Sequence, residues 1–123
     1  MSKLVLIVDD DPMNRELIEA FLTRGGYSTQ SAATGTQALT MLANGTSSPA
    51  LILLDARLGD PDGFEVCARL KRDPATQVIP ILMLSASKLA KDIQHAEEVG
   101  ADGYYHKPDG WQGLMERVAE LIG

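Results

Sequence analysis

The sequence contains a single cysteine and no long run of apolar residues. Because Cys67 has no second cysteine to pair with, an internal disulfide is excluded. Cys67 lies with Val66 and Leu70 in a pattern of helical spacing, which favours a packed thiol over a nucleophile. No apolar run approaches the roughly 18 residues that span a bilayer, and the chain starts with a strand-like run instead of a signal peptide. We therefore expect a cytoplasmic protein without a membrane-spanning segment.

Basic residues are also few, because 11 Lys and Arg stand against 17 Asp and Glu and give a net charge of -6. They are dispersed along the chain, whereas contacts to nucleic-acid phosphates need clustered Lys and Arg. Direct nucleic-acid binding is therefore disfavoured. The sequence has no internal repeat, low-complexity tract or linker, and residues 45–49 form a loop of ordinary length. We expect one domain over residues 1–123.

Short apolar runs recur along the chain. Residues 4–8 and 51–54 are entirely apolar, which predicts parallel strands buried on both faces. Residues 79–84 continue this pattern, and residues 103–106 form a shorter run. The more polar residues 27–32 are rich in β-prone types and predict an edge strand. The sequence thus predicts five strands.

Apolar residues at helical spacing follow each predicted strand. The first helix begins at Asp11 and Pro12, a typical N-cap and first-turn pair, and carries Met13, Leu17 and Phe21 on one apolar face. A strand and a helix repeated five times predict the doubly wound α/β class, a mostly parallel sheet with helices on both faces. Gly25 and Gly26 end the first helix, Gly45 ends the second and Gly100 ends the fourth. The second to fifth helices are predicted over residues 35–44, 64–71, 89–99 and 111–121.

Polar residues stand at the carboxyl ends of four of these strands. In such sheets these ends share one edge, where ligands bind. Asp9 and Asp10 repel each other there, and a hard cation such as Mg²⁺ would keep both ionised, although a solvated acidic turn is the alternative. Taken alone, Asp55 could simply end its strand or cap a helix. Together with Ser85 and Lys107, however, the set suits phosphate and metal chemistry.

Six short motifs accompany this set of polar residues. They are Leu6-Ile7-Val8-Asp9-Asp10-Asp11, Leu53-Leu54-Asp55, Asp62-Gly63, Leu84-Ser85-Ala86, Gly100-Ala101-Asp102-Gly103-Tyr104 and Lys107-Pro108. With them the sequence resembles, over its whole length, the receiver domain of two-component response regulators. The resemblance implies a five-stranded, flavodoxin-like (βα)5 fold with strand order 2-1-3-4-5.

The resemblance also implies a phosphorylation chemistry. Asp55 would take a phosphoryl group from the phosphohistidine of a histidine kinase or phosphotransfer protein. Mg²⁺, or Mn²⁺, would be bound by Asp10, Asp55 and the main-chain carbonyl of Arg57, with Asp9 acting through bound water. The domain would catalyse only its own phosphorylation and slow dephosphorylation, and would otherwise not be an enzyme.

Further residues would report the phosphorylation by this resemblance. Lys107 would pair with one phosphoryl oxygen, and the Ser85 hydroxyl with Ala86 beside it would bind another. Tyr104 matches the aromatic residue that swings inward with that hydroxyl. The change would be read on the face of the fourth helix, fifth strand and fifth helix, by an output protein or a fused effector domain.

Three positions depart from the commonest receiver pattern. Arg57 is a long cation over the site, Gly59 stands where a Pro is usual, and Asp109 stands where an apolar residue is frequent. Arg57 is expected to lengthen the life of the phosphoaspartate by obstructing water. Ser87, which is short, is a poor candidate for orienting an attacking water.

Other protein classes share parts of this pattern. A haloacid-dehalogenase-type phosphatase places a second Asp two residues after its nucleophile, where this sequence has Arg57. A flavodoxin-like electron carrier is disfavoured because residues 9–11 would repel a flavin phosphate. A receiver-like interaction scaffold that is never phosphorylated stays open as an alternative. The sequence also leaves open the kinase, the output partner, and whether the chain is a complete regulator or part of a longer protein.

Overall fold

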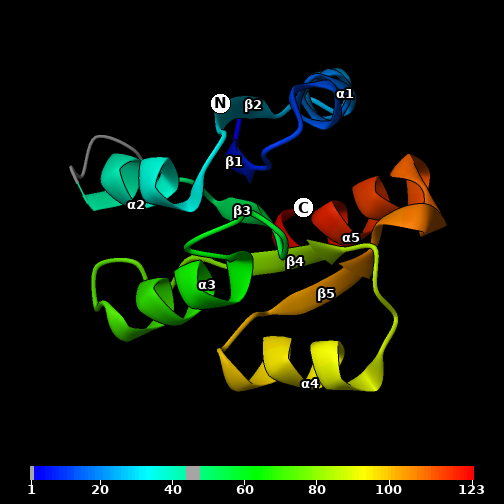
Figure 1. Ribbon diagram of the computed structural model, residues 1–123. Coiled ribbons are helices and arrows are strands. Elements are labelled where there is room, and N and C mark those ends of the chain that lie inside the picture. Colours follow the sequence, from blue (N-terminus) through cyan, green and yellow to red (C-terminus); the bar gives the residue numbers. More distant parts are fainter. Residues whose placement is uncertain (1, 44–47) are drawn as a thin grey trace.

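The computed structural model describes residues 2–43 and 48–123 and shows alternating strands and helices (Figure 1). The strands are β1 (Leu4–Val8), β2 (Ser28–Ala32), β3 (Leu51–Asp55), β4 (Ile81–Ser85) and β5 (Gly103–His106). The helices are α1 (Pro12–Arg24), α2 (Gly35–Ala43), α3 (Gly63–Arg72), α4 (Ala90–Glu98), the 3-10 helix η1 (Lys107–Asp109) and α5 (Trp111–Ile122).

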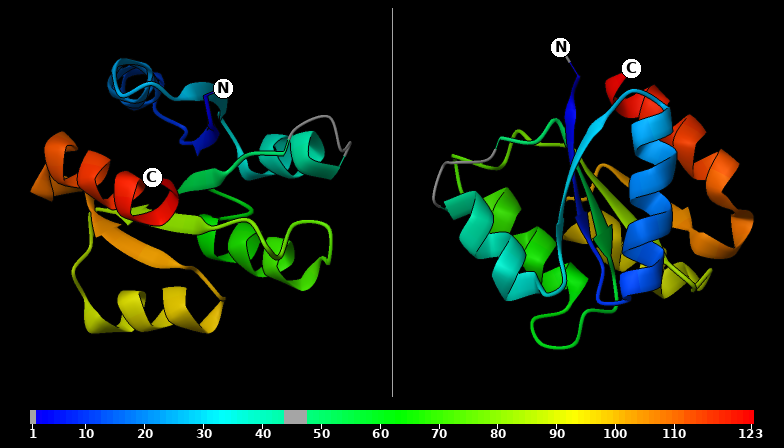
Figure 2. Two further views of the ribbon diagram at one scale, coloured as in Figure 1. Left: turned by 180° about the vertical axis from the view of Figure 1, so that it is seen from behind. Right: turned by 90° about the horizontal axis from the view of Figure 1, so that it is seen from above.

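All five strands form one sheet in the order β2-β1-β3-β4-β5, and every neighbouring pair is parallel. Helices α1 and α5 cover one face of the sheet, and α2, α3 and α4 cover the other (Figure 2). The predicted doubly wound α/β class and the strand order are therefore confirmed. Because the strands run in the same direction, their carboxyl ends share one edge of the sheet.

The central strands are buried on both faces, as their unbroken apolar runs predict. Successive side chains of a strand point to opposite faces, so Leu53 packs against α1 and α5 while Ile52 and Leu54 pack against α2, α3 and α4. At the sheet edge, β2 alternates between exposed and partly buried residues until Ala32. This is the edge strand that the polar composition of the segment predicts.

Helix α1 begins as its sequence predicts but turns a different face to the core. The Asp11 carboxylate accepts a hydrogen bond from the main-chain N of Met13 at 2.9 Å. The residues of α1 that are fully buried are Ile18 and Leu22, whereas Met13 is 68% exposed. The expected stripe of Met13, Leu17 and Phe21 is adjacent to this buried face, and its last member stacks on Trp111 of α5 with ring centroids 6.1 Å apart. The way α1 docks on the sheet decides which of its apolar stripes is buried. The spacing of apolar residues in the sequence does not decide this alone.

Two element boundaries differ from the expectation or fall outside the description. Strand β4 is Ile81–Ser85, two residues later than the apolar run suggested, because Pro80 has no N–H for the ladder. Ser85 is therefore the last residue of the strand. The expected closure of α2 at Gly45, and most of the loop at residues 45–49, lie outside the described residues.

Cys67 is fully buried on α3, and its Sγ donates to the main-chain oxygen of Val99 at 3.7 Å. Burial raises the pKa of the Cys67 thiol to about 11, which agrees with a packed thiol. Within residues 2–43 and 48–123 no helix is both long and apolar enough to cross a membrane.

Gly63 is the glycine that the fold most directly requires. A Cβ at this position would lie 2.1 Å from the main-chain oxygen of Asp55 and 2.8 Å from Cα of Ala56. Both are backbone atoms, so Gly63→Ala forces α3 away from the end of β3. We expect a loss of about 3 kcal/mol in the free energy of unfolding, measured by urea denaturation.

Gly25→Ala is the matched control, because a Cβ there meets its nearest neighbour at 3.4 Å and φ is -79°. It should change the free energy of unfolding by less than about 0.5 kcal/mol. Equal effects of the two substitutions would show that close approach at Gly63 does not limit the fold.

Candidate functional site

The carboxyl edge of the sheet joins three of the predicted polar residues in direct contact. Asp9 follows β1, Asp55 ends β3, and Lys107 begins η1 after β5. The Lys107 Nζ donates to Asp55 Oδ2 at 2.7 Å and to Asp9 Oδ2 at 3.3 Å. Both acids are buried, at 1% and 5% exposed, while the Lys107 side chain is 22% exposed. One ammonium group thus pairs with two buried carboxylates.

Each buried carboxylate is also fixed by the loop that follows it. Asp9 Oδ1 accepts from the main-chain N of Asp11 at 2.9 Å, and Asp55 Oδ1 accepts from that of Arg57 at 3.0 Å. Both are hydrogen bonds to the residue two positions on, a short turn that Asp side chains favour. The remaining oxygen of each acid therefore faces Lys107 in a fixed direction.

Asp10 adds a third carboxylate to this pair. It is exposed, and its ligand atom lies within 4.8 Å of one on each of Asp9 and Asp55. Carboxylate oxygens in such a cluster are the ligands that hard divalent cations prefer. The donor set therefore fits a divalent cation, which would enter from the solvent side occupied by Asp10. The expected contribution of the Arg57 carbonyl stays a prediction.

Burial and charge act together on the central pair. Burial raises the pKa of the Asp55 carboxyl, and the hydrogen bonds from Lys107 and Arg57 oppose that rise only in part. Burial would lower the pKa of Lys107, but the hydrogen bond and charge of Asp55, with the charge of Asp9, outweigh it and raise that pKa. Lys107 therefore remains a cation at neutral pH, and Asp55 depends on nearby positive charge to stay ionised.

The predicted switch residues contact the loop between β4 and α4, which we call the β4–α4 loop (residues 86–89). Ser85 is buried, and its Oγ accepts from the main-chain N of Ser87 at 3.1 Å. The Tyr104 hydroxyl donates to the main-chain oxygen of Ser87 at 2.7 Å. The Ser87 hydroxyl in turn donates to Asp92 of α4 at 2.6 Å. These contacts hold the Ser85 and Tyr104 side chains on the loop.

Two residues at this edge were missed by the sequence analysis. Arg15 of α1 donates from its guanidinium to the main-chain oxygen of Asp9 at 2.7 Å. His106 contacts both Ala86 and Asp109 through its ring nitrogens. Arg15 lies four residues after the helix N-cap, a spacing that returns a long side chain to the start of the helix, and this was an available signal. The position of His106 at the site is set by the register of β4 and β5, in which it pairs with Ser85, and no local sequence signal indicates it.

The departures from the receiver pattern lie at the rim. Arg57 is exposed, although its main-chain N is used by Asp55. Gly59 adopts φ of +91°, a conformation closed to the Pro that is usual there. The loop after β3 is therefore shaped differently from one that carries Pro at this position.

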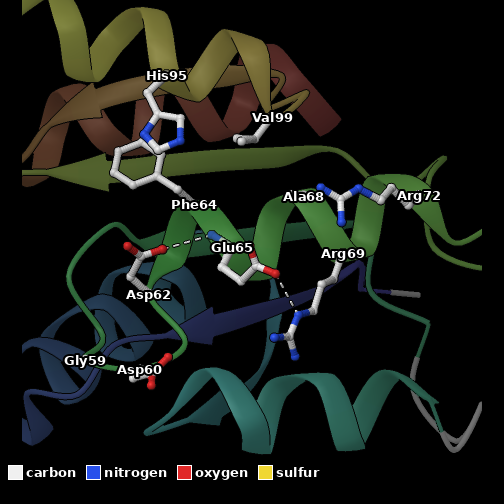
Figure 3. A pocket seen from close by; sticks show the side chains of 10 residues that line it. All are labelled: Gly59, Asp60, Asp62, Phe64, Glu65, Ala68, Arg69, Arg72, His95 and Val99. Carbon is white, nitrogen blue, oxygen red and sulfur yellow. Dashed lines mark hydrogen bonds and ion pairs between the residues drawn. The ribbon is translucent and has the colours of Figure 1, made fainter.

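A cavity of about 660 Å³ lies between α3 and α4, apart from the acid cluster (Figure 3). Phe64 and His95 stack across it with ring centroids 4.2 Å apart and planes 9° from parallel. None of Asp9, Asp10, Asp55 or Lys107 lines it. We therefore place the candidate site at the open carboxyl edge of the sheet and not in this cavity, because the charged groups converge at that edge.

Comparison with known proteins places the chain in a family. The family described as "Response regulator receiver domain" matches residues 5–119, and the chain belongs to it. It is 38% identical over 118 residues to the "DNA-binding dual master transcriptional regulator RpaA" of Synechocystis sp. (strain ATCC 27184 / PCC 6803 / Kazusa), covering 96% of this chain and 48% of that protein. The chain spans about half the length, or less, of the curated relatives it matches first.

Solved structures agree with this membership. A putative response regulator from Chloroflexus aurantiacus J-10-fl has a TM-score of 0.91 and 34% identity, covering 99% of this chain and 98% of that one. The Mn²⁺-bound form of response regulator Rcp1 has a TM-score of 0.83 and 26% identity, covering 96% and 90%. The protein is a receiver domain of two-component signalling, and its acid cluster is compatible with divalent metal binding.

The pairing of Lys107 with two buried acids generates a stability prediction. Lys107→Met leaves Asp9 and Asp55 without their cation, so we expect the metal-free protein to lose about 2 kcal/mol of unfolding free energy, less than for a fully buried pair because Lys107 is partly exposed. Adding Asp55→Asn should recover part of the loss. The measurement is urea denaturation in the presence of a chelator.

Lys91→Met on the exposed side of α4 provides the control and should change stability by less than about 0.5 kcal/mol. If the Lys107 variant were as stable as the Lys91 variant, the buried acids would not depend on this pairing.

Proposed function

We propose that this domain accepts a phosphoryl group on Asp55 within a two-component phosphorelay. The observation that carries the proposal is the contact of one Lys107 ammonium group with Asp55 and Asp9, beside Asp10. Membership of the receiver family supports the phosphoacceptor role. The phosphodonor is the phosphohistidine of a histidine kinase or phosphotransfer protein.

In the proposed transfer, a carboxylate oxygen of Asp55 forms a bond to phosphorus as the phosphorus–nitrogen bond of the donor breaks. The electron pair of that bond leaves with the histidine, and an acyl phosphate remains on Asp55. A divalent cation, Mg²⁺ or Mn²⁺, would be held by Asp10, Asp55 and the Arg57 carbonyl, with Asp9 acting through bound water, and would neutralise the negative oxygens. Lys107 exchanges its carboxylate contact for a phosphoryl oxygen.

The same proposal assigns the switch. The Ser85 hydroxyl and the main-chain N–H of Ala86 bind a further phosphoryl oxygen, and Ser85 gives up its hydrogen bond with Ser87 as it moves inward. Tyr104 then leaves the Ser87 carbonyl and turns inward. Both movements alter the face formed by α4, β5 and α5, where the output partner binds.

The proposed partners are a histidine kinase or phosphotransfer protein upstream and an output protein or fused effector domain downstream. RpaA is by its name a DNA-binding regulator of about twice this length. In this proposal residues 1–123 serve as a single receiver domain in the cytoplasm. Their net charge of -6 disfavours contact with DNA phosphates, so DNA contact is left to another part or partner. The domain catalyses only its own phosphorylation and dephosphorylation. An unphosphorylated interaction scaffold is the alternative that the next experiment tests.

Acetyl phosphate with Mg²⁺ should add one phosphoryl group, detected by intact mass. Asp55→Asn should abolish the added mass, because an amide oxygen is a poor nucleophile, and Asp10→Ala should slow its appearance at least about tenfold through loss of the cation. Asp11→Asn is the matched control in the same loop, because Asn caps α1 as well as Asp does. Labelling of the Asp55→Asn protein would refute the assignment, and no labelling of the wild type would favour the scaffold.

Arg57 generates a prediction about phosphoaspartate lifetime. Its side chain is exposed, and in this proposal its guanidinium binds phosphoryl oxygens and obstructs water, while the Ser87 hydroxyl is already engaged with Asp92. Arg57→Asn, whose amide can orient water, should shorten the lifetime about threefold to tenfold, up to roughly 1.4 kcal/mol of barrier. Mass spectrometry after removal of the donor measures the decay.

Arg72→Asn, at the exposed end of α3, controls for the loss of a surface cation. An unchanged lifetime in the Arg57 variant, or an equal change in the Arg72 variant, would mean that Arg57 has no specific role at the site.

A further inference from the structure

His106 bridges two loops at the carboxyl edge and has no role in the phosphorylation chemistry proposed above. It is the last residue of β5 and pairs with Ser85 across the sheet. Its Nε2 lies 3.1 Å from the main-chain oxygen of Ala86, and its Nδ1 lies 3.1 Å from Oδ1 of Asp109. The side chain is 18% exposed. The ring thus stands between the β4–α4 loop and η1.

The two contacts of His106 can be satisfied together in only one protonation state. A main-chain carbonyl and a carboxylate both accept hydrogen bonds and cannot donate them. Neutral imidazole has one N–H, so one of its nitrogens would present a lone pair to an acceptor oxygen. Imidazolium has two N–H groups and satisfies Ala86 and Asp109 at once. Both contacts can therefore be hydrogen bonds at the same time only when the ring carries two N–H groups.

We propose that His106, when doubly protonated, is a positioning residue that holds the β4–α4 loop against η1. Ala86 lies between Ser85 and Ser87 in the chain. The main-chain N of Ser87 donates a hydrogen bond to the Ser85 hydroxyl. Fixing the Ala86 carbonyl therefore favours the arrangement in which Ser85 stays on the loop. When His106 loses a proton, one of its two contacts is lost, so the ring no longer ties the β4–α4 loop to η1 and the loop is freer to release Ser85. The link to phosphorylation rests on the proposed function, but the loop restraint does not.

The charged groups around His106 come from several elements. Asp109 of η1 is in contact, and Lys88 of the β4–α4 loop lies 3.7 Å from the same carboxylate oxygen. Lys107 directs its ammonium group toward Asp55 and Asp9. On the α4 side, Asp92 is bonded to the Ser87 hydroxyl. On the opposite face of β5, Glu116 and Arg117 of α5 act on Tyr105, the strand neighbour of His106. Asp109 is thus the carboxylate in hydrogen-bond contact with the ring.

The loop restraint is tested by nuclear magnetic resonance on the unphosphorylated chain between about pH 5 and pH 8, where histidine changes charge. We expect the main-chain amides of Ser87 and Lys88 to shift with the same midpoint as the His106 ring. His106→Gln should remove that response. His95, the second of the two histidines, is stacked on Phe64 between α3 and α4, so His95→Gln should leave the response intact.

Lys88→Gln is the second control, because it removes the exposed ion pair to Asp109 but keeps both contacts of the ring. The response of Ser87 should persist in this variant. Loop amides that do not titrate, or that titrate unchanged in His106→Gln, would overturn the restraint. A response that followed His95 instead would overturn it equally.

The effect on phosphorylation is measured as the ratio of labelling rates of His106→Gln and wild type with acetyl phosphate and Mg²⁺, which cancels the pH dependence of the donor. The ratio should be at least about threefold near pH 5.5 and close to one near pH 8, because only the protonated wild type ties the loop to η1 through both contacts. A ratio independent of pH would refute the coupling. If no protein were labelled, the proposed function would fail while the resonance measurement still decided the restraint.

Discussion

The contact of the Lys107 ammonium group with Asp55 and Asp9 is the interaction on which the carboxyl edge of the sheet depends. Both carboxylates are buried, and buried charges need a nearby partner of opposite sign. The sheet order places β3 between β1 and β4, so the acids come from adjacent strands and the lysine crosses from beyond β5. A lysine is long enough for that distance and keeps its charge at neutral pH. The arrangement gathers negative charge that a divalent cation can bind.

The two sides of this edge are held by different groups. On the acid side, Asp9 and Asp55 each accept a main-chain hydrogen bond from their own loops, and Gly63 packs directly onto the end of β3. On the hydroxyl side, Ser87 of the β4–α4 loop forms hydrogen bonds with Ser85, Tyr104 and Asp92, and the Ala86 carbonyl contacts the His106 ring.

The departures from the commonest receiver pattern leave the acid cluster unchanged and alter its surroundings. Gly59 reshapes the loop after β3 through its positive φ, and Arg57 adds a cation at the rim. Asp109 replaces an apolar residue and provides the carboxylate that His106 contacts.

The sequence by itself determined the five strands, their parallel pairing and the polar residues at their ends, because unbroken apolar runs and glycine stops are local signals. It also determined the Asp11 cap and, by family resemblance, the strand order. Only the tertiary structure decided that Ile18 and Leu22, rather than the Met13 stripe, face the core, and that Arg15 and His106 reach the site. These depend on how a helix docks and on which strands are neighbours, and residues 98 positions apart, such as Asp9 and Lys107, meet only through that packing.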